Sequence, residues 1–250
     1  MLKNVFIGIC SALVLSGALV AAHENAVAEP EQKAVIELFT SQGCSSCPPA
    51  DKLLGKLARR DDVVALTFPV DYWDYLGWKD TLASPAFSAR QRAYAKSRGD
   101  GEVYTPQVVV DGVSHAVGSR PSEVRQAIAR SKRKLRNARV PLKLRTEGDS
   151  LVITVGAAPQ GARVKPATVW LALVKKAETV KIARGENRGR TITYHKVVRD
   201  MTPIGQWTGK RVVIKLPKHH LQNRDADGCT VLLQQDTAGP VLAAVEMKTW

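Results

Sequence analysis

The sequence predicts a chain in two parts, an α/β domain over residues 29–137 and an all-β sandwich domain over residues 138–250. In the first part, apolar runs typical of buried strands alternate with amphipathic helical patterns, which indicates parallel strands joined by helical crossovers. In the second part, short and partly alternating apolar runs are separated by turn residues, which is typical of an antiparallel sandwich. With 250 residues and 44% hydrophobic content, the chain has enough apolar material for both cores.

Residues 1–28 have the pattern of a secretory signal peptide. Lys3 precedes an uncharged, largely apolar stretch over residues 5–22, and the small-residue triplet Ala-Val-Ala ends at Ala28. We expect cleavage after Ala28 and a periplasmic or secreted protein. The apolar stretch is longer than most signal cores, so an uncleaved membrane anchor stays open as the alternative. Export would place the cysteines where disulfides persist.

Each element of the α/β part has a local signal. Apolar residues recur at helical spacing between Ala50 and Leu57, Ser84 and Gly99 fit the two ends of a helix, and Asp111-Gly112 is a hairpin turn. The predicted elements are strands 34–39 and 63–70, helices 50–57, 84–99 and 122–137, and a hairpin of 107–110 with 113–117.

The β part contains no helical pattern. Glycines punctuate its apolar runs, which points to short strands joined by turns. The predicted strands are 140–146, 150–155, 168–174, 191–198, 211–216, 230–235 and 241–247.

The cysteine pair Cys44 and Cys47 lies between a predicted strand and a predicted helix. Three-residue spacing at a helix start puts both side chains on one side of the first turn, within reach of a disulfide. The positive end of a helix dipole also favours a thiolate, the nucleophile of disulfide exchange. Pro48 and Pro49 are tolerated only in a first helical turn, so we expect a cap at Ser45 or Ser46 and a pair at the loop–helix junction.

Four segments carry a family resemblance: ELFTSQGCSSCPPAD, PVDYWDYLGWKD, YTPQVVVDG and ENRGRTITYH. They are similar to a family of secreted bacterial proteins catalogued as domain of unknown function 1223, and the resemblance covers nearly all of the chain after residue 28. The order of strands, cysteine pair and helices also resembles the thioredoxin fold in its minimal form. The resemblance therefore implies a thioredoxin-like domain followed by the β-sandwich, and it supplies no established activity.

By resemblance to the thioredoxin fold, Cys44 matches the exposed nucleophile and Cys47 the resolving cysteine. Pro106 matches a cis-proline facing them, and Thr105 would present its backbone to an extended substrate. The sequence departs from that fold at Gly43, where thioredoxins have tryptophan, and between the cysteines, where two serines replace Gly-Pro.

Two further segments bear on partners. Tyr72 and Trp73 follow a predicted strand at the edge where α/β sheets place their sites, so they would bind a polypeptide or, equally, close the core. The net charge is +14, and the helix near residues 120–139 carries eight basic residues against Glu123 alone, so it would attract an anionic surface weakly or form a solvated face. Export and the lack of a recognised motif argue against nucleic acid.

The residues together predict an exported thiol–disulfide oxidoreductase that acts on polypeptide thiols or disulfides and exchanges electrons with a membrane redox donor or acceptor. No cofactor or metal is assigned. Two alternatives stay open. One is a non-catalytic binding protein with a structural disulfide. The other is a copper-binding chaperone with the two thiolates and a distant histidine, because thiolates favour Cu(I); a zinc site would need Cys229, His115 or His195 to fold back to the pair. For Cys229 the default is a buried free thiol.

Overall fold

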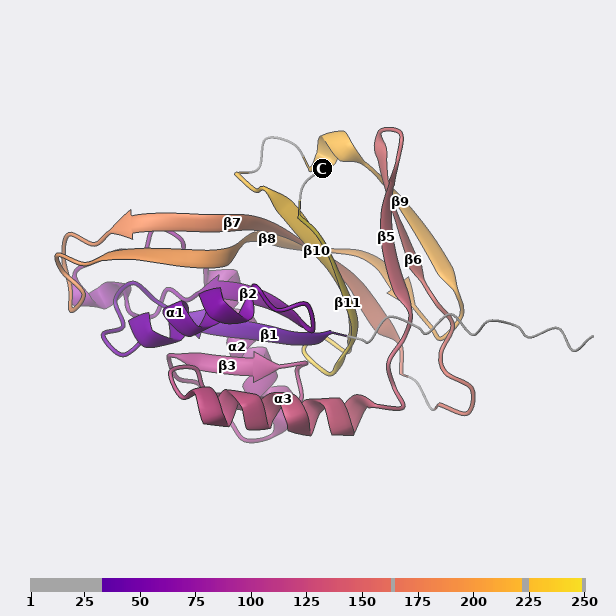
Figure 1. Ribbon diagram of the computed structural model, residues 1–250, viewed down its shortest axis with the longest axis horizontal. Coiled ribbons are helices and arrows are strands. Elements are labelled where there is room, and N and C mark those ends of the chain that lie inside the picture. Colours follow the sequence, from indigo (N-terminus) through magenta and orange to yellow (C-terminus); the bar gives the residue numbers. More distant parts are fainter. Residues whose placement is uncertain (1–32, 163–164, 222–224, 249–250) are drawn as a thin grey trace, which may run out of the picture. The chain divides into compact units, whose positions relative to one another are not determined.

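The computed structural model describes residues 33–162, 165–221 and 225–248, which all fall within one compact unit, Glu31–Trp250. Over these ranges the chain is a mixed α/β structure with an eight-stranded sheet and a second sheet of three strands (Figure 1). The predicted signal peptide, residues 1–28, lies outside the described residues. Among the helices of the described ranges, none is long and apolar enough to cross a bilayer.

The first part of the chain has the predicted alternation of strands and helices. Its elements are β1 Ala34–Thr40, α1 Pro48–Leu57, β2 Val63–Pro69, the short 3-10 helix η1 Asp74–Leu76, α2 Pro85–Arg98, β3 Gln107–Val110, β4 Ser114–Val117 and α3 Pro121–Leu135.

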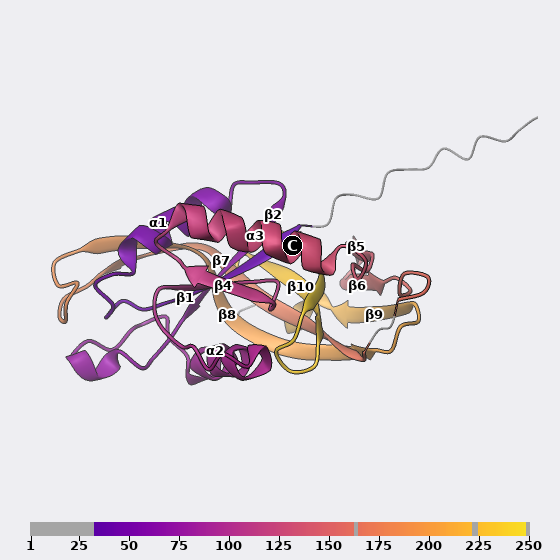
Figure 2. The same cartoon turned by 90° about the horizontal axis from the view of Figure 1, so that it is seen from below.

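Strand β1 lies at the centre of this part, parallel to β2 and antiparallel to β3. Its side chains alternate between two cores, as the period of a strand requires. Val35 and Phe39 pack in a cluster with Phe87 and Tyr94 of α2, whereas Ile36 and Leu38 pack in a cluster with residues of α1 and α3. The sheet therefore lies between α2 on one side and α1 with α3 on the other (Figure 2). Burial on both faces explains why β1 and β2 are continuous apolar runs.

Most of the predicted helix and turn signals are confirmed. Ser84 caps α2 and accepts a hydrogen bond from the Ala86 N–H at 3.3 Å, and Gly99 ends the helix in the left-handed conformation. The cap of α1 differs from the prediction. It is Cys47 instead of a serine, because the first residue after a cap is where proline fits best and Pro48 occupies that position.

The second part of the chain contains only strands and one short 3-10 helix. Its elements are β5 Leu142–Glu147, β6 Ser150–Val155, β7 Ala167–Lys181, β8 Thr191–Trp207, β9 Val212–Pro217, η2 Lys218–His220, β10 Gly228–Gln235 and β11 Val241–Met247. Strands β7 and β8 are about twice as long as predicted. The β7 extension, residues 175–181, is polar and partly exposed, and the β8 extension, residues 199–207, is mostly polar and partly exposed up to the buried Trp207, so neither has the continuous apolar pattern that marks a buried strand.

The large sheet runs through both predicted domains, in the order β11-β10-β7-β8-β2-β1-β3-β4. The link is a short parallel pairing of β2 with β8, at Thr67 opposite Val197. The Thr67 hydroxyl also donates to the His195 carbonyl oxygen at 2.7 Å. The two predicted parts of the chain thus share one sheet through β2 and β8, and the long β7–β8 hairpin extends beside the helical part (Figure 1).

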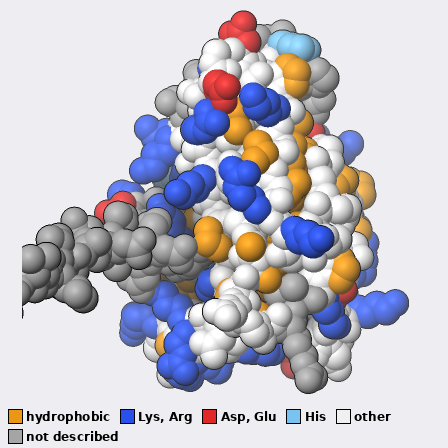
Figure 3. Space-filling model, turned by 90° about the vertical axis from the view of Figure 1, so that its right-hand side faces the viewer, with side chains coloured by type: hydrophobic (Ala, Val, Ile, Leu, Met, Phe, Trp, Pro, Cys, Tyr) orange, Lys and Arg blue, Asp and Glu red, His pale blue; other side chains and the backbone are white. Residues whose placement is uncertain are grey.

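Strands β5, β6 and β9 form the second, antiparallel sheet. Its inner residues, such as Leu151 and Ile153, pack in one apolar cluster with β7, β10 and β11, which gives the sandwich-like layering expected for this part. Its outer residues include the exposed cations Lys143, Arg145 and Lys215. Figure 3 views this end of the molecule and shows Lys and Arg side chains spread over it with apolar groups between them.

Candidate functional site

Cys44 and Cys47 form a disulfide at the start of α1, with their Cα atoms 5.4 Å apart. The loop that carries them folds through two successive turns. The Cys44 N–H donates to the Ser41 carbonyl and the Cys47 N–H donates to the Cys44 carbonyl, each at 3.2 Å. The Ser46 hydroxyl donates to the Cys44 sulfur at 3.4 Å. The pair lies at the loop–helix junction, as predicted.

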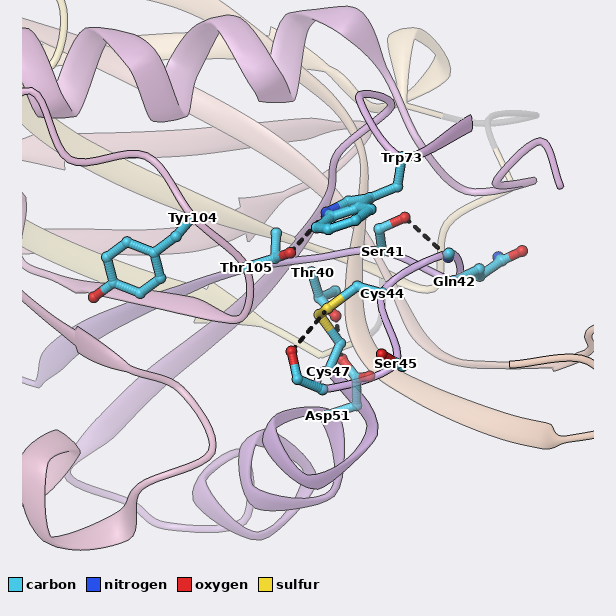
Figure 4. Close-up of a disulfide and its surroundings, with 12 residues drawn as sticks. Thr40, Ser41, Gln42, Cys44, Ser45, Cys47, Asp51, Trp73, Tyr104 and Thr105 are labelled. Carbon is cyan, nitrogen blue, oxygen red and sulfur yellow. Dashed lines mark hydrogen bonds between the residues drawn. A yellow bond between two sulfur atoms is a disulfide. The ribbon is translucent and has the colours of Figure 1, made fainter. Parts of the chain in front are cut away.

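The Thr105-Pro106 peptide bond is cis, as expected. Trp73 connects this peptide to the cysteine loop. Its indole Nε1–H donates to the Thr105 hydroxyl at 2.8 Å, and its Cβ lies 3.0 Å from the position that a Cβ on Gly43 would take. A side chain on residue 43 would therefore press against Trp73, which is a physical reason for glycine beside the cysteine pair. Figure 4 shows Thr105 and Trp73 on one side of the disulfide.

The aromatic segment after β2 packs around the cysteine loop. Tyr72 and Trp73, both predicted to bind substrate or to close the core, are partly buried, and the Tyr72 hydroxyl donates to Gln91 at 3.1 Å. Tyr75 stacks on Trp73 with 6.4 Å between ring centroids and is 77% exposed. Tyr75 is therefore the aromatic side chain that this segment offers to solvent.

The turn that connects β7 to β8 reaches the cysteine loop from about 140 residues further along the sequence. Asn187 is fully buried there, and its side-chain Nδ2 donates to the carbonyl oxygens of Gln42 at 2.9 Å and Cys44 at 2.8 Å. The Ser45 N–H donates to the Glu186 carboxylate at 3.3 Å. These two residues belong to the ENRGRTITYH segment, to which the sequence assigned no role.

The two sulfurs are covered in this structure. Cys44 is 1% exposed and Cys47 is 0% exposed, while Ser45 and Ser46 between them are exposed. The exposed nucleophile implied by the thioredoxin resemblance is therefore wrong for this conformation. The reason is tertiary, because Trp73 and Asn187 come from other elements and both contact the loop.

A buried carboxyl group lies one helical turn beyond the cysteines. Asp51 is four residues after Cys47, on the same face of α1, and is 3% exposed. Its Oδ1 accepts from the Thr40 hydroxyl at 2.8 Å, and its Oδ2 has no hydrogen-bond partner among the described residues. Burial raises the pKa of Asp51 to about 8, against the lowering effect of the Thr40 bond. Asp51 is therefore largely protonated at neutral pH.

A second buried acid holds the loop ahead of the cysteines. Asp80 accepts from the Gln42 N–H at 2.7 Å and from the Leu82 N–H at 2.8 Å. Burial raises its pKa to about 6. Tyr194 of β8 lies near both acids. Burial raises the pKa of its hydroxyl most, and the charges of Asp51 and Asp80 raise it further. This hydroxyl has no hydrogen-bond partner among the described residues. The interior next to the disulfide is thus acidic and poorly solvated.

The three side chains considered as extra metal ligands lie in separate surroundings. Cys229 is buried in the sandwich cluster, and burial raises its pKa to about 12. His115 accepts from or donates to the Tyr104 hydroxyl at 2.9 Å and lies 3.4 Å from Asp100. His195 packs on Gly55 of α1. In the described ranges no three His, Cys, Asp or Glu side chains are grouped to hold a metal ion, so nothing there favours the copper alternative.

The family described as "Protein of unknown function (DUF1223)" matches residues 35–234. The chain belongs to this family. The match includes the cysteine pair, the cis-proline and the β7–β8 turn, so the whole site lies within the family's extent.

Two solved structures are similar to this DUF1223 protein. A crystal structure of a protein from Agrobacterium tumefaciens shares 35% identity, with 88% of this chain and 96% of that chain covered and a TM-score of 0.77. HBP35 of Porphyromonas gingivalis shares 12% identity, with coverage of 88% and 76% and a TM-score of 0.56, which is a likeness of fold alone. A search of curated proteins found no match.

Proposed function

We propose that this protein is an exported thiol–disulfide oxidoreductase whose redox centre is the Cys44–Cys47 disulfide. One observation carries the proposal: a disulfide at the start of a helix, one helical turn from a buried carboxyl group of raised pKa. Strongly perturbed carboxyl groups are concentrated at functional sites. The sheet order β2-β1-β3-β4 with its three helices supports assigning the first part of the chain to the thioredoxin-like class.

The proposed reaction begins when a thiolate of a polypeptide partner attacks the Cys44 sulfur. A bond forms between the two sulfurs, the Cys44–Cys47 bond breaks, and its electron pair leaves on Cys47. Asp51, protonated at neutral pH, gives its proton to the Cys47 thiolate. A second thiolate of the partner then attacks the partner sulfur in the mixed disulfide. The partner leaves as a disulfide and the Cys44 thiolate is released, so the partner is oxidised and the protein is reduced.

The reverse reaction uses the same groups. The Cys44 thiolate attacks a partner disulfide, and ionised Asp51 accepts the Cys47 proton while Cys47 resolves the intermediate. A membrane redox donor or acceptor would restore the starting state. Export rests on the signal-peptide pattern of residues 1–28, and disulfide exchange on secreted or envelope proteins agrees with that location.

Equilibration with glutathione redox buffers tests the proposal. The native protein is expected to gain two alkylatable thiols over a narrow range of buffer ratios, and a Cys47→Ser variant is expected to accumulate a mixed disulfide at Cys44. A Cys229→Ala background removes the third thiol from the count. If the native disulfide does not exchange with any glutathione ratio, the oxidoreductase proposal fails.

A second candidate is favoured by the burial of both sulfurs. In it, the disulfide is structural and the protein binds a partner through other surfaces, such as the exposed Tyr75. This candidate predicts that only global unfolding exposes the disulfide to reductants. The glutathione experiment separates the two, because a structural disulfide would stay oxidised in the native state.

A further inference from the structure

The contacts between the β7–β8 turn and the cysteine loop are made to main-chain groups. Asn187 donates to two carbonyl oxygens, of Gln42 and Cys44, and Glu186 accepts from the Ser45 N–H. Asn187 uses both hydrogens of its amide, and its Oδ1 has no partner among the described residues. The turn therefore occupies hydrogen-bonding groups directly at the disulfide.

The attachment of this turn is local. Within residues 181–190 only the side chains of Ile182 and Asn187 are fully buried, whereas Arg184, Arg188 and Arg190 are exposed. Gly185 and Gly189, with φ of +74° and +82°, form left-handed corners on either side of residues 186–188. The β7–β8 ladder continues to the pair Lys181–Thr191, before the turn begins. Residues 186–188 can thus move away while the ladder stays paired, which is the kind of local opening that costs least.

We infer that residues 185–188 form a reversible cover over the disulfide, and that an extended polypeptide segment displaces it by pairing with the same main-chain groups. Asn187 donates two N–H hydrogens to these carbonyls and Glu186 accepts from the Ser45 N–H, so an extended polypeptide can replace the same bonds with two of its N–H groups and one carbonyl. A small thiol without amide groups makes none of these hydrogen bonds when it enters, and leaves the Gln42 and Cys44 carbonyls to water. The cover therefore selects polypeptides over small thiols. The preference for a polypeptide partner rests on the proposed function, whereas the existence of the cover does not.

The rate of disulfide reduction by dithiothreitol tests the cover, with free thiols counted by mass after alkylation. An Asn187→Ala variant loses both hydrogen bonds and is expected to be reduced about tenfold or more faster than the wild type. Arg184→Ala, an exposed residue just before the cover, serves as the control and is expected to change the rate by less than about twofold. Equal rates for Asn187→Ala and the wild type would overturn the inference.

A measurement on the wild type covers the case in which Asn187→Ala does not fold. The reduction rate is followed at low guanidinium concentrations, below the unfolding transition. Local opening exposes little surface, so the logarithm of the rate is expected to rise much less steeply than global unfolding predicts. A slope equal to that of global unfolding would show that no cover opens independently, which contradicts the inference.

The polypeptide preference has its own comparison. A cysteine-containing peptide of extended sequence and a small thiol of equal thiol pKa are compared as attacking groups on the wild type and on Asn187→Ala. The wild type is expected to favour the peptide, and the variant is expected to lose most of that preference. If the wild type shows no preference, the assigned partner is wrong. If cover and preference both hold while the protein catalyses no exchange between protein disulfides, the proposed function fails and the cover stands.

Discussion

Replacing Asp51 with asparagine is expected to stabilise the protein, by an amount that grows with pH. The carboxyl group is 3% exposed, and burial raises its pKa from 3.8 to about 8. Between these two values the unfolded chain has an ionised Asp51 while the folded protein keeps the proton. Folding therefore takes up one proton, and the stability of the wild type falls as pH rises through this window. Asparagine has nearly the same shape and removes this proton uptake.

The magnitude follows from the width of the window. Each pH unit between the two pKa values lowers the stability of the wild type by about 1.4 kcal/mol. The expected advantage of Asp51→Asn is near zero at pH 3, about 4 kcal/mol at pH 7 and about 6 kcal/mol above pH 8. A gain of this size is a large share of the stability of an ordinary domain.

Guanidinium unfolding of both proteins at several pH values between 3 and 9 gives the difference directly. The informative quantity is its change with pH, since any change in packing shifts it equally at every pH. A difference that stays constant from pH 4 to pH 8 would show that Asp51 ionises normally in the folded state. It would also remove Asp51 from the proposed proton transfer to Cys47.

Three other outcomes are expected. Gly55→Ala would place a Cβ 2.5 Å from the His195 ring, so it should cost about 1–3 kcal/mol in chemical unfolding; an unchanged midpoint would contradict that contact. Arg90→Met should lower the free energy of unfolding by about 3–5 kcal/mol, because it removes the cation that pairs with buried Glu37 at 2.7 Å; adding Glu37→Gln should recover part of the loss. If the double variant is no more stable than the single one, the pair is not the cause. Cys229, whose pKa burial raises to about 12, should resist iodoacetamide at pH 8 in the native protein and react in urea, as mass spectrometry would show; rapid native labelling would place it at the surface.

The parts of the site that the sequence predicted correctly are those set by neighbours along the chain. The junction between the cysteine pair and α1 follows from Pro48 and Pro49, which fit only a first turn. The β3–β4 turn follows from Asp111-Gly112, both with positive φ. Asp51 also had a local signal that was missed, since it stands four residues after Cys47 and three before Leu54, on the buried stripe of α1.

Other features depend on residues that are far apart in the sequence. Nothing in the local pattern of ENRGRTITYH connects Asn187 to Cys44, and the polar end of β7, residues 175–181, does not resemble a strand. The pairing of Thr67 with Val197, which joins the two parts of the chain, rests on a single register position.

The sequence by itself determined which residues form the helices and strands of the first part and where the two cysteines stand, because capping, turn and periodic signals act over a few residues. Only the tertiary structure decided whether the sulfurs are exposed and how strongly Asp51 holds its proton. Solvent exposure and electrostatic environment are sums over all groups around an atom. Around this disulfide, those groups come from β1, the aromatic segment and a turn about 140 residues away.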